Sequence, residues 1–158
     1  MLLMDIRYKI ADSTREFQDG KKLFLQYATS LNIDLSFQNF EDELKTIDQQ
    51  YNKPGGALII VYNGNEPIGC AGLRKIDAET AELKRMFVLA AYNGKGIGKK
   101  MLGSIIDIAR ELNYKKLRLD TLPDMIQAQR LYRSSGFIEI APYRYNPVKQ
   151  ALFMEKEL

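Results

Sequence analysis

Three glycines at alternate positions, Gly94, Gly96 and Gly98, separate a strand-like segment from an apolar helical pattern in YNGKGIGKKML. Glycine has no Cβ and accepts a positive φ, so this run predicts a sharp turn from strand into helix. The first N–H groups of a helix have no partner within the helix, and the helix dipole favours an anion there. The run therefore predicts either a plain turn or a backbone cradle for phosphate.

The segments around this turn predict one mixed α/β domain over 1–158. Period-two alternation and short apolar runs predict strands over 5–12, 57–62, 68–76, 80–89, 115–121, 137–141 and 151–158. Apolar residues at spacings of three and four predict helices over 14–31, 37–51, 97–113 and 124–134. The order βααβββαβαββ has short connections and no linker, which is typical of a single mixed domain.

The chain contains no histidine, which excludes a Ser-His-Asp triad, a Cys-His pair and a His-ligated zinc site. Acid and base chemistry must therefore use carboxylates, tyrosines, lysines, Cys70 or water. The net charge of +3 is too small to indicate nucleic acid, but it suits an anionic small molecule. A single cysteine excludes an internal disulfide and points to a reducing cytoplasm, and the opening MLLM is too short for a signal peptide or a membrane span.

The glycine run does not fit two well-known phosphate loops. A Walker loop needs four residues between its glycines and a Ser or Thr after its lysine, but Gly94 and Gly98 enclose three residues and Lys99 precedes Lys100. The dinucleotide fingerprint would need a glycine at Lys99. Both types of site are therefore excluded.

The run does resemble the acyl-CoA loop of the GNAT superfamily of N-acyltransferases, which reads Arg or Gln, two residues, Gly, one residue, Gly or Ala. The longer stretch AELKRMFVLAAYNGKGIGKKML is similar to the strand, loop and helix of that family, and AQRLYRSSGF is similar to its later helix and turn. The similar motifs span about 57–158. Two positions depart from the pattern: Asn93 replaces the usual Arg or Gln, and Met125 stands where many members carry asparagine.

The resemblance implies a GNAT-like α/β domain with a mostly antiparallel mixed sheet of six to seven strands flanked by about four helices. It implies transfer of an acetyl group from acetyl-CoA to a primary amine by direct attack in a ternary complex, with no metal. The implied acceptor is a small-molecule or peptide amine in a pocket walled by 14–51 and 141–150, and a homodimer is compatible with the resemblance. No nucleic acid or membrane partner is expected. The residues implied to bind CoA are Met86, Phe87, Val88, Gly94, Lys95, Gly96, Ile97, Gly98 and Lys99.

The strand before the glycine run changes phase. Ala81 and Leu83 alternate with charged residues, but the chain is apolar without interruption from Met86 to Leu89. A β-bulge leaves such a pattern, and so does a wholly buried strand. The resemblance implies that backbone groups of Met86, Phe87 and Val88 meet the pantetheine arm of CoA and polarise the thioester carbonyl.

The resemblance also implies two catalytic residues. Glu82 lies where many relatives carry a general base; an exposed structural glutamate is the alternative, and Asp120 or water are the other candidates for the base. Tyr132 matches the tyrosine that acts as general acid at the CoA sulfur. Because a phenol, with a pKa of ~10, is a weaker acid than a thiol at ~8.5, stabilising the thiolate by a hydrogen bond is at least as plausible as protonating it. A packed helix tyrosine is its structural alternative.

A non-catalytic acyl-CoA sensor is the rival function, because a chain can keep the glycine loop and lose the chemistry. The presence of both Glu82 and Tyr132 favours the enzyme.

Overall fold

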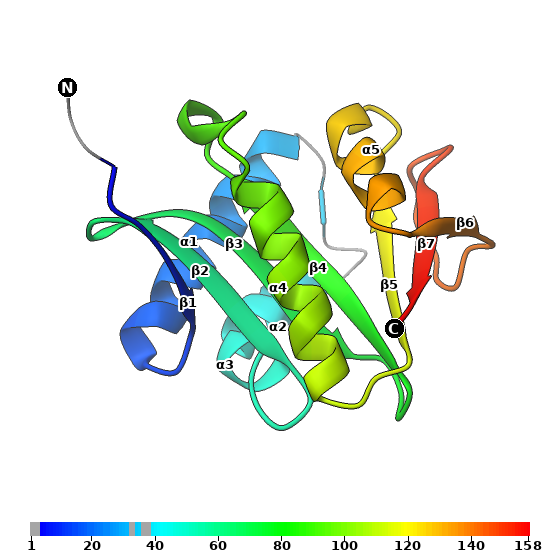
Figure 1. Cartoon of the computed structure of the whole chain (residues 1–158), viewed down its shortest axis with the longest axis horizontal. Helices are drawn as coiled ribbons and strands as arrows, with labels where there is room; N and C mark the ends of the chain where they lie inside the picture. The colour runs from blue at the N-terminus through cyan, green and yellow to red at the C-terminus, as the bar shows by residue number, and fades with distance from the viewer. Residues whose placement is uncertain (1–3, 32–33, 36–38) are drawn as a thin grey trace.

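A computed structural model of the chain describes residues 4–31, 34–35 and 39–158. One seven-stranded sheet runs through it in the order β1-β2-β3-β4-β5-β7-β6 (Figure 1). Neighbouring strands are antiparallel except for the central pair β4 and β5, which is parallel. The predicted mostly antiparallel mixed sheet is therefore confirmed. The strands are β1 (Ile6–Ile10), β2 (Ala57–Asn63), β3 (Glu66–Lys75), β4 (Thr80–Val88), β5 (Lys116–Thr121), β6 (Ile138–Ile140) and β7 (Leu152–Glu157).

Helices cover both faces of the sheet, and Figure 1 shows α4 in front of it and α1 behind it. On the α4 face, Met101 and Ile105 of the helix pack in one core with Leu83 and Leu117 of the strands. On the other face, Phe24 of α1 belongs to a second core. No helix in the described part of the chain is long and apolar enough to cross a membrane. The helices are α1 (Thr14–Leu31), α2 (Phe40–Lys45), α3 (Ile47–Gln50), α4 (Ile97–Glu111) and α5 (Ile126–Ser134).

The single helix predicted over 37–51 is wrong, because the described part of this segment forms the two short helices α2 and α3. Residues 37 and 38 lie outside the described residues. The chain leaves helical geometry at Thr46, whose φ is −116° and ψ is 24°. The Thr46 hydroxyl donates a hydrogen bond to the carbonyl of Asp42 at 2.7 Å, so the side chain competes with the backbone for an acceptor.

The phase change in β4 is a β-bulge, as one of the two alternatives predicted. Cys70 of β3 pairs with Phe87 and Gly72 pairs with Lys84, so two residues of β4 face one residue of β3. Arg85, one of the two, has a left-handed φ of 58°. Met86, Phe87 and Val88 are only partly buried, so the alternative of a wholly buried strand is wrong.

The central strands β4 and β5 separate along their length. Their ladder runs only from Thr80–Lys116 to Glu82–Arg118, although β4 continues to Val88 and β5 to Thr121. The backbone of β4 beyond Glu82 therefore has no β5 partner on that side. This opening positions the candidate site.

Candidate active site

A groove of about 320 Å³ runs along the end of β4, the loop before α4 and one side of α5. It contains every residue that the sequence predicted to bind CoA except Lys95. The residues lining it are Met86, Phe87, Val88, Tyr92, Asn93, Gly94, Gly96, Ile97, Gly98, Lys99, Gln127, Ala128 and Leu131.

The glycine loop has the geometry of a backbone cradle. Gly94 and Gly96 both have a φ of 77°, which side-chain-bearing residues rarely adopt, and no heavy atom lies within 4 Å of where their Cβ atoms would be. Gly96 is the N-cap of α4 and makes no side-chain cap, and the first residues of the helix line the groove, so no capping side chain occupies the first N–H groups there. These features suit an anion such as a pyrophosphate.

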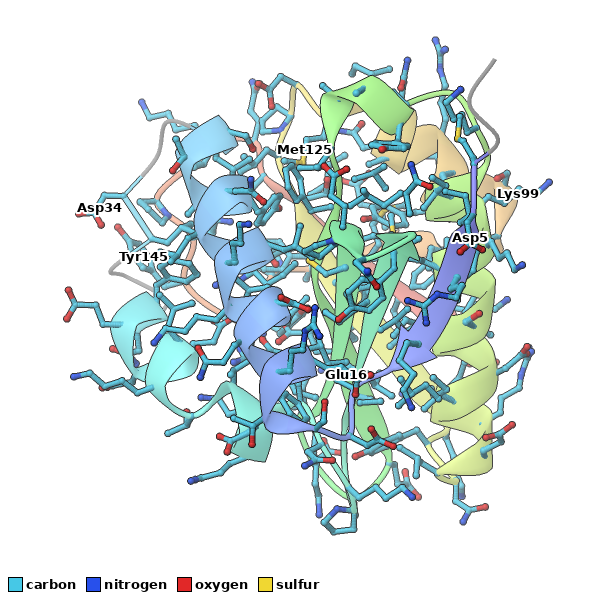
Figure 2. The ribbon with its side chains drawn as sticks, turned by 90° about the vertical axis from the view of Figure 1, so that its left-hand side faces the viewer. Asp5, Glu16, Asp34, Lys99, Met125 and Tyr145 are labelled. Carbon is cyan, nitrogen blue, oxygen red and sulfur yellow. The ribbon has the colours of Figure 1, made fainter. Side chains whose placement is uncertain are left out.

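The lysines of the loop point in different directions. Lys99 lines the groove, and Figure 2 shows its side chain extending away from the body of the molecule, at the opposite edge from Tyr145. The ammonium of Lys100 instead lies over the ring of Tyr8 in β1, 4.4 Å from the centroid. Lys95 is exposed and does not line the groove.

Tyr132 of α5 belongs to the core on the α4 face of the sheet and lines neither the groove nor the cavity described below. Its ring packs edge-on against Phe137 with centroids 5.8 Å apart, and only 7% of the residue is exposed. Burial raises the pKa of the Tyr132 phenol, and the charges of Tyr27 and Asp120 add to the shift. A phenol that holds its proton this firmly suits donation of a hydrogen bond better than transfer of a proton.

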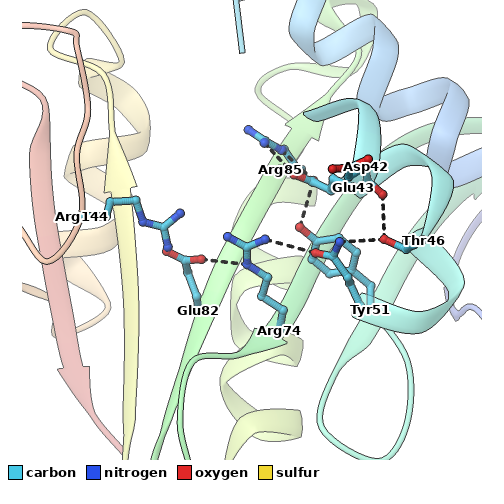
Figure 3. Close-up of polar contacts among 9 residues, drawn as sticks. Asp42, Glu43, Thr46, Tyr51, Arg74, Glu82, Arg85 and Arg144 are labelled. Carbon is cyan, nitrogen blue, oxygen red and sulfur yellow. Dashed lines mark hydrogen bonds and ion pairs between the residues drawn. The ribbon is translucent and has the colours of Figure 1, made fainter. Parts of the chain in front are cut away.

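Glu82 is fully buried and bound through both of its oxygens (Figure 3). Arg74 Nε donates to Oε1 at 3.0 Å, the Tyr143 hydroxyl donates to Oε2 at 2.7 Å, and Arg144 forms an ion pair with the same Oε2. The residue lines neither the groove nor the cavity described below. These contacts fit a structural role that joins β3, β4 and the segment 141–151, and the role of general base stays a prediction.

A second, smaller cavity of about 50 Å³ lies where β4 and β5 separate. Residues of α1, β4, β5 and the segment after β6 line it. Both segments predicted to wall the acceptor pocket, 14–51 and 141–150, therefore contribute to it. The residues lining it are Tyr27, Leu31, Leu35, Leu83, Lys84, Arg85, Asp120, Thr121, Leu122, Asn146 and Val148. It shares Leu31, Leu122 and Val148 with an outer hollow of about 490 Å³.

Asp120 of β5 and Lys84 of β4 both line this inner cavity. Asp120, the second candidate for the base, accepts a hydrogen bond from the Asn146 amide at 3.3 Å. Lys84 is 3% exposed, and burial followed by the charge of Arg85 lowers its pKa to about 7. Sequence reasoning missed Lys84, although its place two residues after Glu82 puts it on the same side of the strand.

Cys70 is a buried structural residue. Its thiol donates to the carbonyl of Arg85 at 3.3 Å, and burial raises its pKa, so the thiolate is disfavoured. A reactive cysteine needs the opposite environment.

Sequence comparisons identify relatives over most of the chain. The model of the Acetyltransferase (GNAT) family matches residues 23–137. An uncharacterised N-acetyltransferase of Dictyostelium discoideum is 30% identical over 88% of this chain and 93% of its own length. An uncharacterised N-acetyltransferase of Schizosaccharomyces pombe is 30% identical over 91% of this chain and 90% of its own length.

Solved structures share the fold. An acetyltransferase from Streptococcus agalactiae superposes with a TM-score of 0.80 at 21% identity, over 97% of this chain and 98% of its own. A GNAT family acetyltransferase from Elizabethkingia anophelis, solved with acetyl-CoA bound, has a TM-score of 0.65 at 23% identity, over 97% of this chain and 98% of its own. With the family model, the relatives and the fold in agreement, the chain belongs to the GNAT family of acetyltransferases.

Proposed function

We propose that this protein moves an acetyl group from acetyl-CoA to a primary amine by direct attack, with both substrates bound at once. The observation that carries the proposal is the position of two hollows on one strand. Residues 86–88 of β4 line the groove, and residues 83–85 line the inner cavity. Because a strand advances only about 3.3 Å per residue, molecules bound in the two hollows would lie within reach of each other.

The groove suits CoA in shape and charge. When bound there, acetyl-CoA would supply an activated acetyl carbon and a thiolate leaving group. The N–H groups at the start of α4 would hold the pyrophosphate, and the backbone of Met86, Phe87 and Val88, free of β5, would meet the pantetheine arm as an added strand does. The bound acetyl-CoA in the structure from Elizabethkingia anophelis, which shares the fold, supports this choice of ligand.

The inner cavity suits the reacting amine of the acceptor. Its volume of about 50 Å³ holds an amino group but not a whole acceptor molecule. The body of the acceptor would occupy the outer hollow of about 490 Å³, between Ser30 of α1 and Met125 before α5. Tyr132 would donate a hydrogen bond to the departing sulfur.

Release of free CoA from acetyl-CoA, measured with a thiol reagent across a panel of amines, polyamines, amino acids and peptides, tests the proposal. At least one acceptor should release CoA in step with an acetylated product seen by mass spectrometry. A protein that binds acetyl-CoA by calorimetry but acetylates no member of the panel would instead be the non-catalytic sensor.

A further inference from the structure

The buried carboxylate of Glu82 is poorly placed to accept a proton from an acceptor. Its Oε1 is held by Arg74 and its Oε2 by Tyr143 and Arg144. It faces a separate hollow on the side of α3 and β3, lined with Gln50 and Arg74, and not the inner cavity. To take a proton from an amine in the inner cavity, Glu82 would have to break these contacts and move.

Lys84 lies in the inner cavity, where the proposed function places the ammonium group of the acceptor. It lines the inner cavity from β4, together with Asp120 of β5 and Tyr27 of α1. Tyr27 also touches the groove side of the strand, because its ring lies 5.6 Å from the ring of Phe87. The inner cavity, which Lys84 lines, is therefore connected to the groove of the proposed function through the contact of Tyr27 with Phe87.

We propose that Lys84, in its neutral form, is the general base that takes the proton from the acceptor ammonium in the inner cavity. The inference rests on the proposed function, since it assigns a role within that reaction. Asp120 then acts on Lys84 through its charge and is not itself the base.

The surroundings of Lys84 lower its pKa, so that a substantial fraction of its side chains is neutral at pH 7. Burial is the largest influence, and Arg85 and Arg74 add repulsion, while Asp120 of β5 and Glu43 of α2 oppose them; the pKa settles at about 7. A base is most effective when its pKa lies near the working pH, and a carboxylate at ~4.3 would be a weaker base by roughly 500-fold. Burial raises the pKa of Tyr27 to about 12, so this phenol keeps its proton and does not compete.

The reaction moves one proton to Lys84 and a second to the sulfur of CoA. The neutral amine of Lys84 accepts one proton from the acceptor ammonium, which leaves the acceptor nitrogen with its lone pair. That lone pair forms the C–N bond to the acetyl carbon while the C–S bond breaks and its electron pair stays on sulfur. A second proton of the acceptor nitrogen passes to the sulfur, and Lys84 returns its proton to water.

The pH dependence of kcat/KM tests the role of Lys84. The wild-type value should rise with pH to half of its maximum near pH 7, where half of Lys84 is neutral, and level off above that pH. Lys84→Met and Lys84→Arg remove the base, the second while keeping the size and positive charge, and each should lower kcat/KM by about 100-fold or more at pH 7. The loss should shrink toward pH 10, where the acceptor arrives already neutral, and CoA affinity measured by calorimetry should stay the same.

A titration that needs no catalysis gives a second readout. The ¹³Cε resonance of Lys84, assigned by its absence in Lys84→Arg, should titrate near pH 7 in the free wild-type protein. In Asp120→Asn it should titrate at lower pH, because the Asp120 charge that supports the ammonium is gone.

Three results would overturn the inference. The ¹³Cε resonance could show Lys84 still protonated above pH 9. A folded Lys84→Arg protein could keep kcat/KM within about threefold of an active wild type at pH 7. Asp120→Asn could abolish activity while the Lys84 variants keep it, which would make Asp120 the base. Each of these leaves the proposed function standing, whereas a wild type that acetylates no amine removes the proposed function and this role with it.

Discussion

Glu43 of α2 and Arg85 of β4 form a buried ion pair with two hydrogen bonds, 2.9 Å from Nε to Oε2 and 2.8 Å from Nη2 to Oε1 (Figure 3). Tyr51 donates a third hydrogen bond to the same carboxylate at 2.9 Å. Arg85 is also the bulge residue with a positive φ, a conformation that costs roughly 1–3 kcal/mol in a residue other than glycine. The pair therefore links the short helix α2 to the bulge that ends the regular part of β4.

Breaking this pair should destabilise the protein. Glu43→Gln leaves the Arg85 guanidinium buried without a counter-charge, and we expect a loss of about 3–5 kcal/mol in the free energy of unfolding by urea denaturation. Adding Arg85→Met should recover part of the loss, because the unpaired charge is removed. A double variant as unstable as the sum of the two single variants would contradict the coupling.

The Glu43 carboxylate should make the free energy of unfolding depend on pH in the acidic range. Burial alone would raise the pKa of Glu43, but the hydrogen bonds and charge of Arg85 outweigh it, so the folded pKa lies below its ordinary value. The stabilisation is then complete above the unfolded pKa of ~4.3 and is lost as pH falls through the folded pKa. Wild type should lose more stability than Glu43→Gln below pH 4.5, in unfolding curves recorded from pH 6 to pH 3. Parallel curves for the two proteins would contradict this prediction.

Gly96→Asp should abolish CoA binding, because a negative charge would meet the pyrophosphate at the start of α4. Aspartate and asparagine tolerate a positive φ better than most residues, so Gly96→Asp should fold and Gly96→Asn is the matched neutral control. Calorimetry should show a much larger Kd for the aspartate variant than for the asparagine variant. Near-normal affinity in a folded Gly96→Asp protein would rule out the cradle.

Tyr132→Phe should lower turnover by about 10- to 1000-fold, the range expected on loss of one donor to a developing charge or of one acid. CoA affinity and fold should change little, since only a hydroxyl is lost. Tyr114→Phe is the control: its hydroxyl donates to the Gly55 carbonyl, outside the groove and the inner cavity, so its loss should affect stability but not turnover. Single-turnover rates compare the two, and an unchanged rate in Tyr132→Phe would make it a packing residue.

Glu82→Gln distinguishes a structural carboxylate from a base. The contacts to Arg74 and Arg144 lead us to expect a loss of about 3 kcal/mol in unfolding free energy, with the pH profile of kcat/KM unchanged in shape. The exposed Glu79→Gln, which loses only a surface pair with Lys115, should cost no more than about 1 kcal/mol. A drop in turnover that recovers at high pH, with stability unaffected, would instead make Glu82 the base.

The sequence by itself determined the features that depend on neighbours along the chain. The glycines at 94, 96 and 98 predicted the turn into α4, because only residues without a Cβ freely adopt the φ of 77° observed at two of them. The loss of alternation at Met86 predicted either a bulge or a wholly buried strand, since an extra residue shifts every later side chain to the opposite face and burial on both faces removes the alternation. The register of β3 and β4 decided for the bulge. Apolar periodicity likewise predicted each strand to within a few residues.

Only the tertiary structure decided the surroundings of the charged residues. Glu82 and Lys84 both lie on β4, two residues apart, yet one is bound by Arg74 and Arg144 and the other lines the inner cavity with Asp120. The partners of Glu82 come from β3 and from the segment after β6, up to 62 positions away along the chain, and periodicity carries no information about which distant side chains meet. The break at Thr46 likewise reflects contacts with distant residues. It separates α2, whose Glu43 pairs with Arg85, from α3, whose Ile47 packs in the core. Burial and charge act through space, so the pKa of a side chain and its use in chemistry follow from the packed fold.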